Sequence, residues 1–195
     1  MKYERDAPIL PTVERVRAAS EEFNKENSVI EQALKELFGQ YRGNNNHPHV
    51  LLKVVALNRL YSAGILGVHD AAYHIYQHAQ EIDAALTDGA PEAVDRIAKV
   101  KISSSGKQLK FWSFASKYCS WHNQPSYPIW DSRVCRYLTS LKGTPFAHPD
   151  LWTHYKEFRE LMVVFRDHYE LGSLSFKEID AFLWKYGAKL PAPQI

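Results

Sequence analysis

The sequence predicts an all-α protein, and three kinds of observation support that prediction. Apolar residues recur at helical spacing, most clearly from Val50 to Tyr61. Serine precedes two of the helical runs with glutamate three positions later, the arrangement of a capping box. Glycine and proline fall where helices would end or begin, and no stretch gives a clear strand or hairpin signal. We therefore expect about nine or ten helices joined by short loops.

Helix start and stop signals predict where the helices of the first half of the chain begin and end. Ser28 with Glu31 forms a capping box, and Pro48 stands where a first-turn proline is favoured. Gly39 and Gly89 follow apolar runs, where glycine commonly ends a helix. These signals predict helices over about residues 12–24, 28–38, 48–61, 68–86 and 91–99.

The second half continues the pattern around a turn and a loop. Residues 103–106 form a tight turn, and a long aromatic helix follows it to Trp121. His122 to Pro128 is a loop, after which Asp131 begins the next helix. The remaining signals predict a long amphipathic helix from Pro149 to near Leu171, and a last one from the capping box of Ser175 and Glu178 to Gly187.

Composition is that of an ordinary globular chain. Its 24 Lys and Arg against 22 Asp and Glu give a formal net charge of +2. The two cysteines, Cys119 and Cys135, indicate neither a disulfide framework nor a zinc site, and they exclude a four-cysteine iron–sulfur cluster. No apolar run suits a membrane span, and the first residues lack the apolar core of a signal peptide. We therefore expect a cytoplasmic, nucleoid-associated protein.

Local charge is more informative than the total. Between Arg96 and Lys117 the chain carries no Asp or Glu, and this acid-free run predicts a surface that contacts a polyanion. The cations of the run are Arg96, Lys99, Lys101, Lys107, Lys110 and Lys117.

Two segments resemble a known enzyme family. Residues 128–138 read PIxDxxVxRxL, which resembles the signature around the catalytic aspartate of the helix-hairpin-helix DNA glycosylase superfamily. Residues 110–118 (KFWSFASKY) resemble the lysine-bearing helix of the archaeal 8-oxoguanine DNA glycosylase/lyases, where a second lysine also follows the nucleophile. The resemblance implies a single domain, 1–195, folded as a two-lobed helical bundle with a cleft between its lobes. The core lobe would span about 44–140, and the second lobe 1–43 plus 141–195.

The resemblance further implies that Lys110 and Asp131 are the catalytic pair of a DNA glycosylase with β-lyase activity. The lysine would attack the sugar carbon that carries the base and form a Schiff base, while the aspartate handles the proton and the developing positive charge. A helix beginning after Gly106 would place Lys110 in its first turns, where the macrodipole disfavours a protonated amine. Each residue also has a plainer interpretation, because lysines on helices are usually solvated and Asp131 is a good N-cap.

The remaining candidate residues surround this pair. The family's hairpin usually reads Leu-Pro-Gly-x-Gly, whereas residues 102–106 read ISSSG, so the chain departs from the family's pattern there. We expect no cofactor and no metal, a monomer, and double-stranded DNA with a modified or damaged base as the partner. The candidates for DNA binding are Ser104, Ser105, Gly106, Lys107, Lys117, Asn58, Arg59 and Arg133, and those for the base pocket are Trp112, Trp121, His122, Tyr127 and Trp130.

Two other functions remain open from the sequence. A DNA-binding module on the same scaffold would share every fold-level feature without the chemistry. A metal-dependent HD-type phosphohydrolase would use a His-Asp pair with scattered further ligands. The sequence identifies neither the excised base nor a role in repair rather than defence. The residues that suggest metal chemistry are His69-Asp70 with His47 or His49 and Asp131, and separately His74 with His78.

Overall fold

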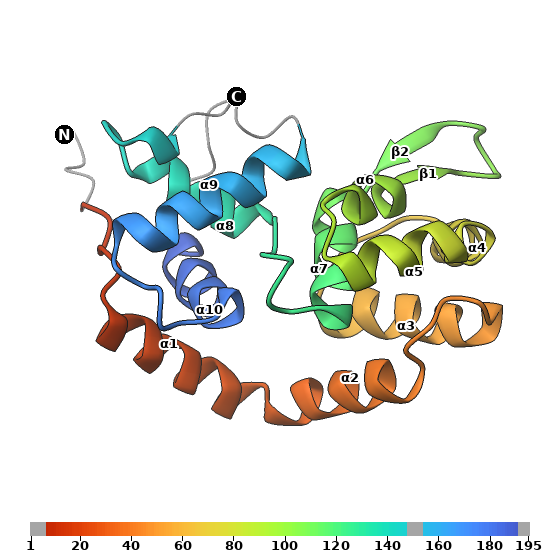
Figure 1. Ribbon diagram of the computed structural model, residues 1–195, viewed down its shortest axis with the longest axis horizontal. Coiled ribbons are helices and arrows are strands. Elements are labelled where there is room, and N and C mark those ends of the chain that lie inside the picture. Colours follow the sequence, from red (N-terminus) through yellow and green to blue (C-terminus); the bar gives the residue numbers. More distant parts are fainter. Residues whose placement is uncertain (1–6, 148–153, 191–195) are drawn as a thin grey trace.

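The computed structural model describes residues 7–147 and 154–190, and these are mostly helical. Within them the chain forms ten α-helices, one short 3₁₀-helix and one small hairpin (Figure 1). The all-α prediction is thereby confirmed at the level of fold class. Among these residues no helix combines the length and apolar character needed to cross a membrane.

The helices lie in two groups (Figure 1). In the first group α10 packs on both α1 and α8. The chain enters this group twice, once at its beginning and once after the segment that follows α7. Its members are α1 (Val13–Glu26), α8 (Ser132–Ser140), the 3₁₀-helix Pro145–Ala147, α9 (Tyr155–His168) and α10 (Phe176–Gly187).

The second group holds the middle of the chain. Here α3 packs on α4, α6 packs on α7, and α2 lies against α3 and α7. The expected lobe boundaries at 43/44 and 140/141 differ from this grouping, because α2 packs with the middle helices and α8 with α10. The members are α2 (Ser28–Gln40), α3 (His47–Leu60), α4 (Val68–Gln77), α5 (Ala79–Asp88), α6 (Glu92–Ala98), β1 (Lys99–Lys101), β2 (Gln108–Lys110) and α7 (Trp112–His122).

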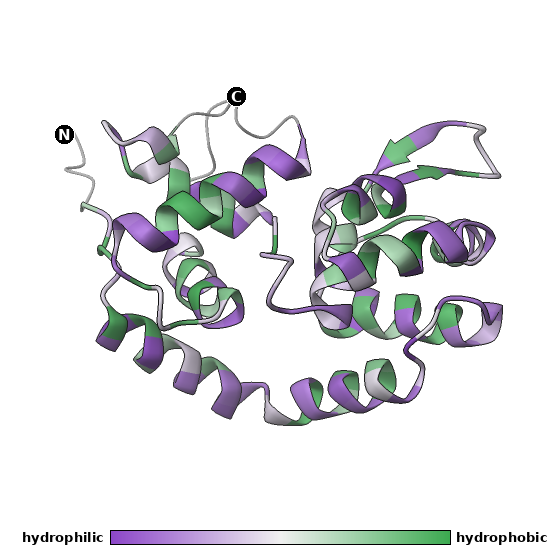
Figure 2. Ribbon diagram, in the orientation of Figure 1, coloured by the Kyte–Doolittle hydropathy of each residue, from purple (hydrophilic) through white to green (hydrophobic). Residues whose placement is uncertain are grey.

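One continuous apolar core joins the two groups. The apolar faces of the helices turn toward each other and their polar faces outward (Figure 2). At the junction, the buried Trp130 stacks on Phe158 of α9 and on Trp112 of α7, with ring centroids 5.4 and 5.3 Å apart respectively. Aromatic packing therefore holds the segment before α8 against both groups.

A β-hairpin occupies the turn that precedes α7, and it corrects two expectations. Strands β1 and β2 pair antiparallel, with Lys99 opposite Lys110. The prediction of no hairpin was wrong because each strand has three residues, with one inward apolar residue, Val100 or Leu109, between polar neighbours. The prediction that Lys110 lies on a helix was also wrong, since α7 begins only at Trp112. Gly106, with φ +66°, supplies the left-handed residue of the turn.

Helix boundaries were otherwise predicted with mixed success. The capping box of Ser175 and Glu178 is confirmed. The first helix begins close to its expected start, with Thr12 as the N-cap of α1. The expected helix over 68–86 is two helices that meet at His78. Pro149 lies outside the described residues. The prediction of a capping box at Ser28 and Glu31 was wrong. Asn27 precedes α2 without a side-chain cap, and Glu31 accepts hydrogen bonds from Tyr61 and Lys177 instead.

Packing of α10 on α8 requires glycine at position 187. A Cβ at Gly187 would clash with the backbone oxygen of Arg133, which cannot move without shifting α8. Gly187→Ala should therefore lower the free energy of unfolding by roughly 1–3 kcal/mol. Gly39→Ala is the matched control, because nothing lies within 4 Å of a Cβ there. It should stabilise by about 0.5–1 kcal/mol. Urea unfolding of both variants tests this, and equal effects would contradict it.

Candidate functional site

A cavity of about 440 Å³ lies where the two groups of helices meet. Polar and charged side chains from both groups line it, which distinguishes it from the apolar core nearby. Its wall comprises Phe23, Asn27, Leu60, Tyr61, Ser62, Ser113, Lys117, Asp131, Ser132, Arg133, Arg136, Asp180 and Trp184.

Asp131 lies in this wall and uses its two carboxylate oxygens differently. Oδ1 accepts hydrogen bonds from the backbone N–H groups of Arg133 (2.9 Å) and Val134 (3.0 Å), so the side chain caps α8 as predicted. Oδ2 lies 3.5 Å from Nζ of Lys117. One carboxylate therefore fixes the start of α8 and holds a cation from α7.

The segment before α8 places Asp131 against α7. The backbone N–H of Trp130 donates to Oγ of Ser116 (3.0 Å), one residue before Lys117 on α7. The hydroxyl of Tyr155 on α9 donates to the backbone oxygen of Pro128 (2.8 Å). Contacts from α7 and α9 thus set the position of the carboxylate.

Lys117 is buried, with only 8% of its side chain exposed. Its ammonium contacts Asp131 and donates to the backbone oxygen of Tyr61 (3.4 Å), where α3 ends. Ser113, one turn earlier on α7, lines the same cavity. The amine is therefore held between α3, α7 and α8, with a wall of the cavity beside it.

Two further polar groups in the wall have unmet hydrogen-bonding capacity. Oδ1 of Asp180 and Nε of Arg136 are buried without a partner among the described residues. Burial raises the pKa of Asp180 well above its ordinary value, the nearby charge of Asp131 raises it further, and Lys117 and Lys177 oppose this. Both residues line the cavity, and an unpaired buried acceptor and donor are unusual because buried polar groups are normally hydrogen-bonded.

Lys110, the lysine expected to pair with Asp131, is exposed on β2 and does not line this cavity. The expectation assumed a helix beginning at Gly106, and the hairpin moves that start to Trp112. Lys117, expected to contact DNA, takes the position beside Asp131 instead. The predicted contact between Lys110 and Asp131 is therefore absent from the described structure, and the lysine that contacts Asp131 is Lys117.

The five aromatic candidates for a base pocket do not come together. Tyr127 and Trp130 belong to the core, where the Tyr127 hydroxyl contacts the backbone and Trp130 stacks between rings. Trp112 is half-buried against Trp130. Trp121 and His122 line a different, larger cavity. Trp184, which was not among the candidates, is the tryptophan of the cavity beside Lys117, and Arg133 lies over its ring at 3.8 Å.

The residues expected to bind DNA also lie in separate parts of the structure. Ser104, Ser105, Gly106 and Lys107 are exposed at the hairpin turn, and Arg59 is exposed at the end of α3. Asn58 is committed to the loop after α3, because its side chain bonds both the N–H and the oxygen of Ile65. Arg133 lines the cavity.

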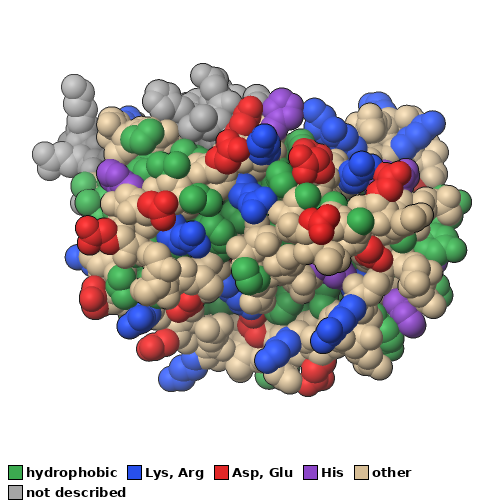
Figure 3. Space-filling model, in the orientation of Figure 1, with side chains coloured by type: hydrophobic (Ala, Val, Ile, Leu, Met, Phe, Trp, Pro, Cys, Tyr) green, Lys and Arg blue, Asp and Glu red, His purple; other side chains and the backbone are tan. Residues whose placement is uncertain are grey.

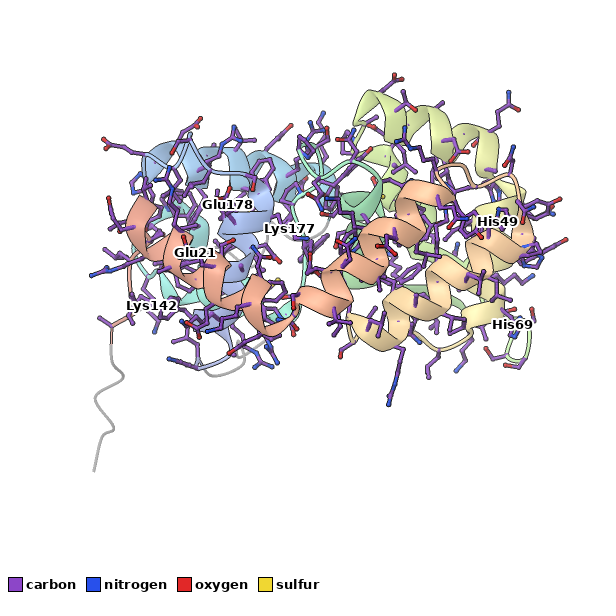
Figure 4. All side chains as sticks on the ribbon, turned by 90° about the horizontal axis from the view of Figure 1, so that it is seen from below. Glu21, His49, His69, Lys142, Lys177 and Glu178 are labelled. Atoms are coloured by element: carbon purple, nitrogen blue, oxygen red, sulfur yellow. The ribbon has the colours of Figure 1, made fainter. Side chains whose placement is uncertain are left out.

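The metal-binding alternative lacks its ligand set in the described part of the chain. No three His, Cys, Asp or Glu side chains there are grouped to hold a metal ion. His49 and His69 lie on different helices near the outer end of the second group (Figure 4). Nε2 of His74 and Nδ1 of His78 each hydrogen-bond to backbone oxygens.

Asp180 and Arg136 were not among the candidate site residues predicted from the sequence. The motif at residues 128–138 could have led to the prediction of Arg136, because arginine is one of its fixed positions. Asp180 lies 49 residues after Asp131, and no local pattern connects the two. Only the packing of α10 on α8 brings this second carboxylate to the cavity.

Comparison with known proteins identifies a family. The family described as HI_0787_N, an N-terminal domain, matches residues 13–127, more than half of the chain. The chain belongs to this family. A protein of Haemophilus influenzae described as uncharacterized is 34% identical over 137 residues, which cover 68% of this chain and 63% of that relative. The match therefore spans less than two thirds of the relative's length. No solved structure matches the chain.

The raised pKa of Asp180 predicts a pH-dependent stability. Because the folded state holds this proton more tightly than the unfolded state, stability is lost as pH rises from the ordinary pKa of an aspartate toward the raised one. Asp180→Asn mimics the protonated form, so it should stabilise at pH 8 by on the order of 1 kcal/mol or more. The gain should vanish near pH 3.

Thermal unfolding of Asp180→Asn across this pH range tests the prediction. Asp88→Asn, at an exposed carboxylate at the end of α5, controls for the general effect of removing a negative charge. An equal gain at both pH values, or a loss at pH 8, would contradict it.

Proposed function

We propose that the protein is a DNA glycosylase with β-lyase activity, and that Lys117 is its nucleophile. The observation that carries the proposal is the buried contact between Lys117 and Asp131, in a cavity where the helix groups meet. The resemblance of residues 128–138 to the glycosylase signature supports the same role for Asp131. The two helix groups, with the cavity at their junction, suit the two-lobed architecture of that superfamily.

The proposed chemistry uses the pair directly. Asp131 accepts a proton from the ammonium of Lys117, whose free amine attacks C1′ of the nucleotide as the bond to the base breaks. The base leaves with the bonding electrons and takes up a proton. The aminal formed at C1′ then opens the sugar ring: the C1′–O4′ bond breaks, O4′ takes up a proton, and the Schiff base forms. Loss of a proton from C2′ then allows β-elimination of the 3′ phosphate. The Asp131 carboxylate is held by two backbone N–H groups, so it needs little reorganisation as positive charge develops on the sugar.

The hairpin supplies a surface for the DNA backbone. Lys99, Lys101, Lys107 and Lys110 are exposed on it, and Lys and Arg side chains gather at that end of the molecule (Figure 3). None of the four has a carboxylate ion-pair partner among the described residues. Lysines directly opposite each other, such as Lys99 and Lys110, repel, and phosphates would relieve this repulsion.

Borohydride trapping on a panel of duplexes with modified bases tests the proposal. The native protein should give a covalent adduct with at least one duplex, and Lys117→Arg should give none. Arginine can keep the charge contact with Asp131, but it stays protonated and cannot form the Schiff base. Lys110→Ala should retain the adduct and bind DNA more weakly. Asp131→Asn, which keeps the capping ability, should slow excision roughly a hundredfold.

The control variants separate the alternatives. An adduct that persists in Lys117→Arg and disappears in Lys110→Ala would restore Lys110 as the nucleophile. DNA binding without an adduct on any duplex would favour the non-catalytic DNA-binding module.

The contribution of the hairpin can be measured independently through salt dependence. Replacing Lys101 and Lys107 by Gln should reduce the slope of log affinity against log salt by about 0.9 for each phosphate that the protein no longer neutralises. Lys142→Gln, at an exposed lysine in the other helix group (Figure 4), is the matched control and should leave the slope unchanged. Equal slopes for the hairpin variant and the native protein would remove the hairpin from the DNA-binding surface.

A further inference from the structure

A second and larger cavity, of about 970 Å³, shares no lining residue with the one beside Lys117. It is bounded by one face of α2, the end of α5, and the last turn of α7 with the residues that follow it. Every lining residue except Lys177 lies within residues 13–127, the part of the chain that matches the family. The cavity is therefore almost entirely a feature of the family's domain.

A polar partition lies between the two cavities. Glu31 accepts hydrogen bonds from the hydroxyl of Tyr61 and from the ammonium of Lys177. Lys177 also lies over the ring of Trp121, with Nζ 4.4 Å from its centroid. Lys177 stands on α10 near the junction of the helix groups (Figure 4). Tyr61 faces the cavity of Lys117, whereas Glu31 and Trp121 face the larger one.

A buried lysine organises the inner wall of the larger cavity. Lys53 is fully buried, and its Nζ contacts three acceptors: the oxygen of Gly43 (3.1 Å), Oδ1 of Asn44 (2.8 Å) and Nε2 of His122 (3.3 Å). An ammonium has three N–H donors and no acceptor, so Nε2 of His122 must accept. The ring proton of His122 is therefore on Nδ1.

His122, which lines the cavity, is consequently a neutral N–H donor. Burial and the charge of Lys53 lower the pKa of His122 to about 3, so the ring stays uncharged at neutral pH. Burial lowers the pKa of Lys53 to about 8, and Asp83 opposes this shift, so the amine remains mostly protonated. A fixed N–H on His122 suits a ligand with a neutral acceptor, such as a ring nitrogen or a carbonyl oxygen.

The carboxylates of the cavity are already engaged, whereas two of its cations lack a carboxylate partner. One of these, Arg42, donates from Nε to the backbone oxygen of Gly39 (3.3 Å). Glu31 is held by Tyr61 and Lys177, and Asp83 accepts from the backbone N–H of Asn44 (3.0 Å) and from its side chain. Lys35 and Arg42 are exposed at the cavity, and neither has a carboxylate partner among the described residues. The last carbonyls of α5 and α7 add partial negative charge, which the buried Lys53 offsets. The charges of the larger cavity that remain available to a ligand are therefore those of two cations, Lys35 and Arg42, which lie at its rim.

We propose that this cavity binds a nucleoside monophosphate. The base would lie beside Trp121 with an acceptor atom on Nδ1–H of His122, and the phosphate would pair with Lys35 and Arg42. The volume falls at the upper end of the range for small-molecule sites, about 300–1,000 Å³. The proposal does not depend on the glycosylase activity, because the two cavities share no lining residue.

Isothermal titration calorimetry of the full chain tests the proposal. The titrants are the ribo- and deoxyribonucleoside monophosphates, the matching nucleosides, and inorganic phosphate. At least one monophosphate should bind, and its nucleoside and inorganic phosphate should each bind at least tenfold more weakly. Lys35→Gln and Arg42→Gln, at exposed positions that do not threaten folding, should each weaken the monophosphate tenfold. Lys25→Gln, at an exposed lysine of α1 outside both cavities, should leave it unchanged.

Three results would overturn the proposal: no binding by any monophosphate at millimolar concentration, equal binding of inorganic phosphate, or native affinity in both rim variants. The same variants separate this proposal from the glycosylase activity. Lys35→Gln and Arg42→Gln should form the borohydride adduct as the native protein does, whereas Lys117→Arg should bind the monophosphate normally and form no adduct.

Discussion

The carboxylate of Asp131 is the point on which the junction of the two helix groups depends. One oxygen fixes the first turn of α8, and the other holds the ammonium of Lys117 on α7. The position of α8 in turn brings Arg133 against Trp184 and against Gly187 on α10. The local geometry of one side chain thus sets how helices far apart in sequence meet.

Burying such a pair is not an efficient way to stabilise a fold. Removing two charges from water costs several kcal/mol per ion, and apolar residues of similar volume often serve as well. The cavity beside the pair also leaves an acceptor on Asp180 and a donor on Arg136 unsatisfied. This concentration of costly polar groups at one place is more typical of a site that binds or reacts than of a packing contact, and it underlies the proposed function.

The larger cavity is organised by a different buried cation. Within the described part of the chain Lys53 contacts no carboxylate directly, and its three donors are shared among a backbone oxygen, an amide and a histidine ring. Asn44 links this network to Asp83 and to the hydroxyl of Tyr118. Such a connected polar network gives a rigid wall, because rotating one side chain would leave the next without a partner. The two cavities therefore differ in character, one with unmet hydrogen bonds and the other with a fixed donor and free charges at its rim.

Features that depend on neighbours within a few residues could be predicted from the sequence alone. These are the helical fold class, the capping box of Ser175 and Glu178, and Asp131 as an N-cap, because capping bonds join residues two or three positions apart. The short hairpin escaped detection because three residues are too few to distinguish alternation from chance. Tertiary packing, in contrast, selected the lysine that meets Asp131, directed Glu31 to Tyr61 and Lys177 instead of the start of α2, and buried Lys53. These outcomes depend on contacts between residues far apart in sequence, and on where α7 begins, which the pairing of β1 with β2 sets.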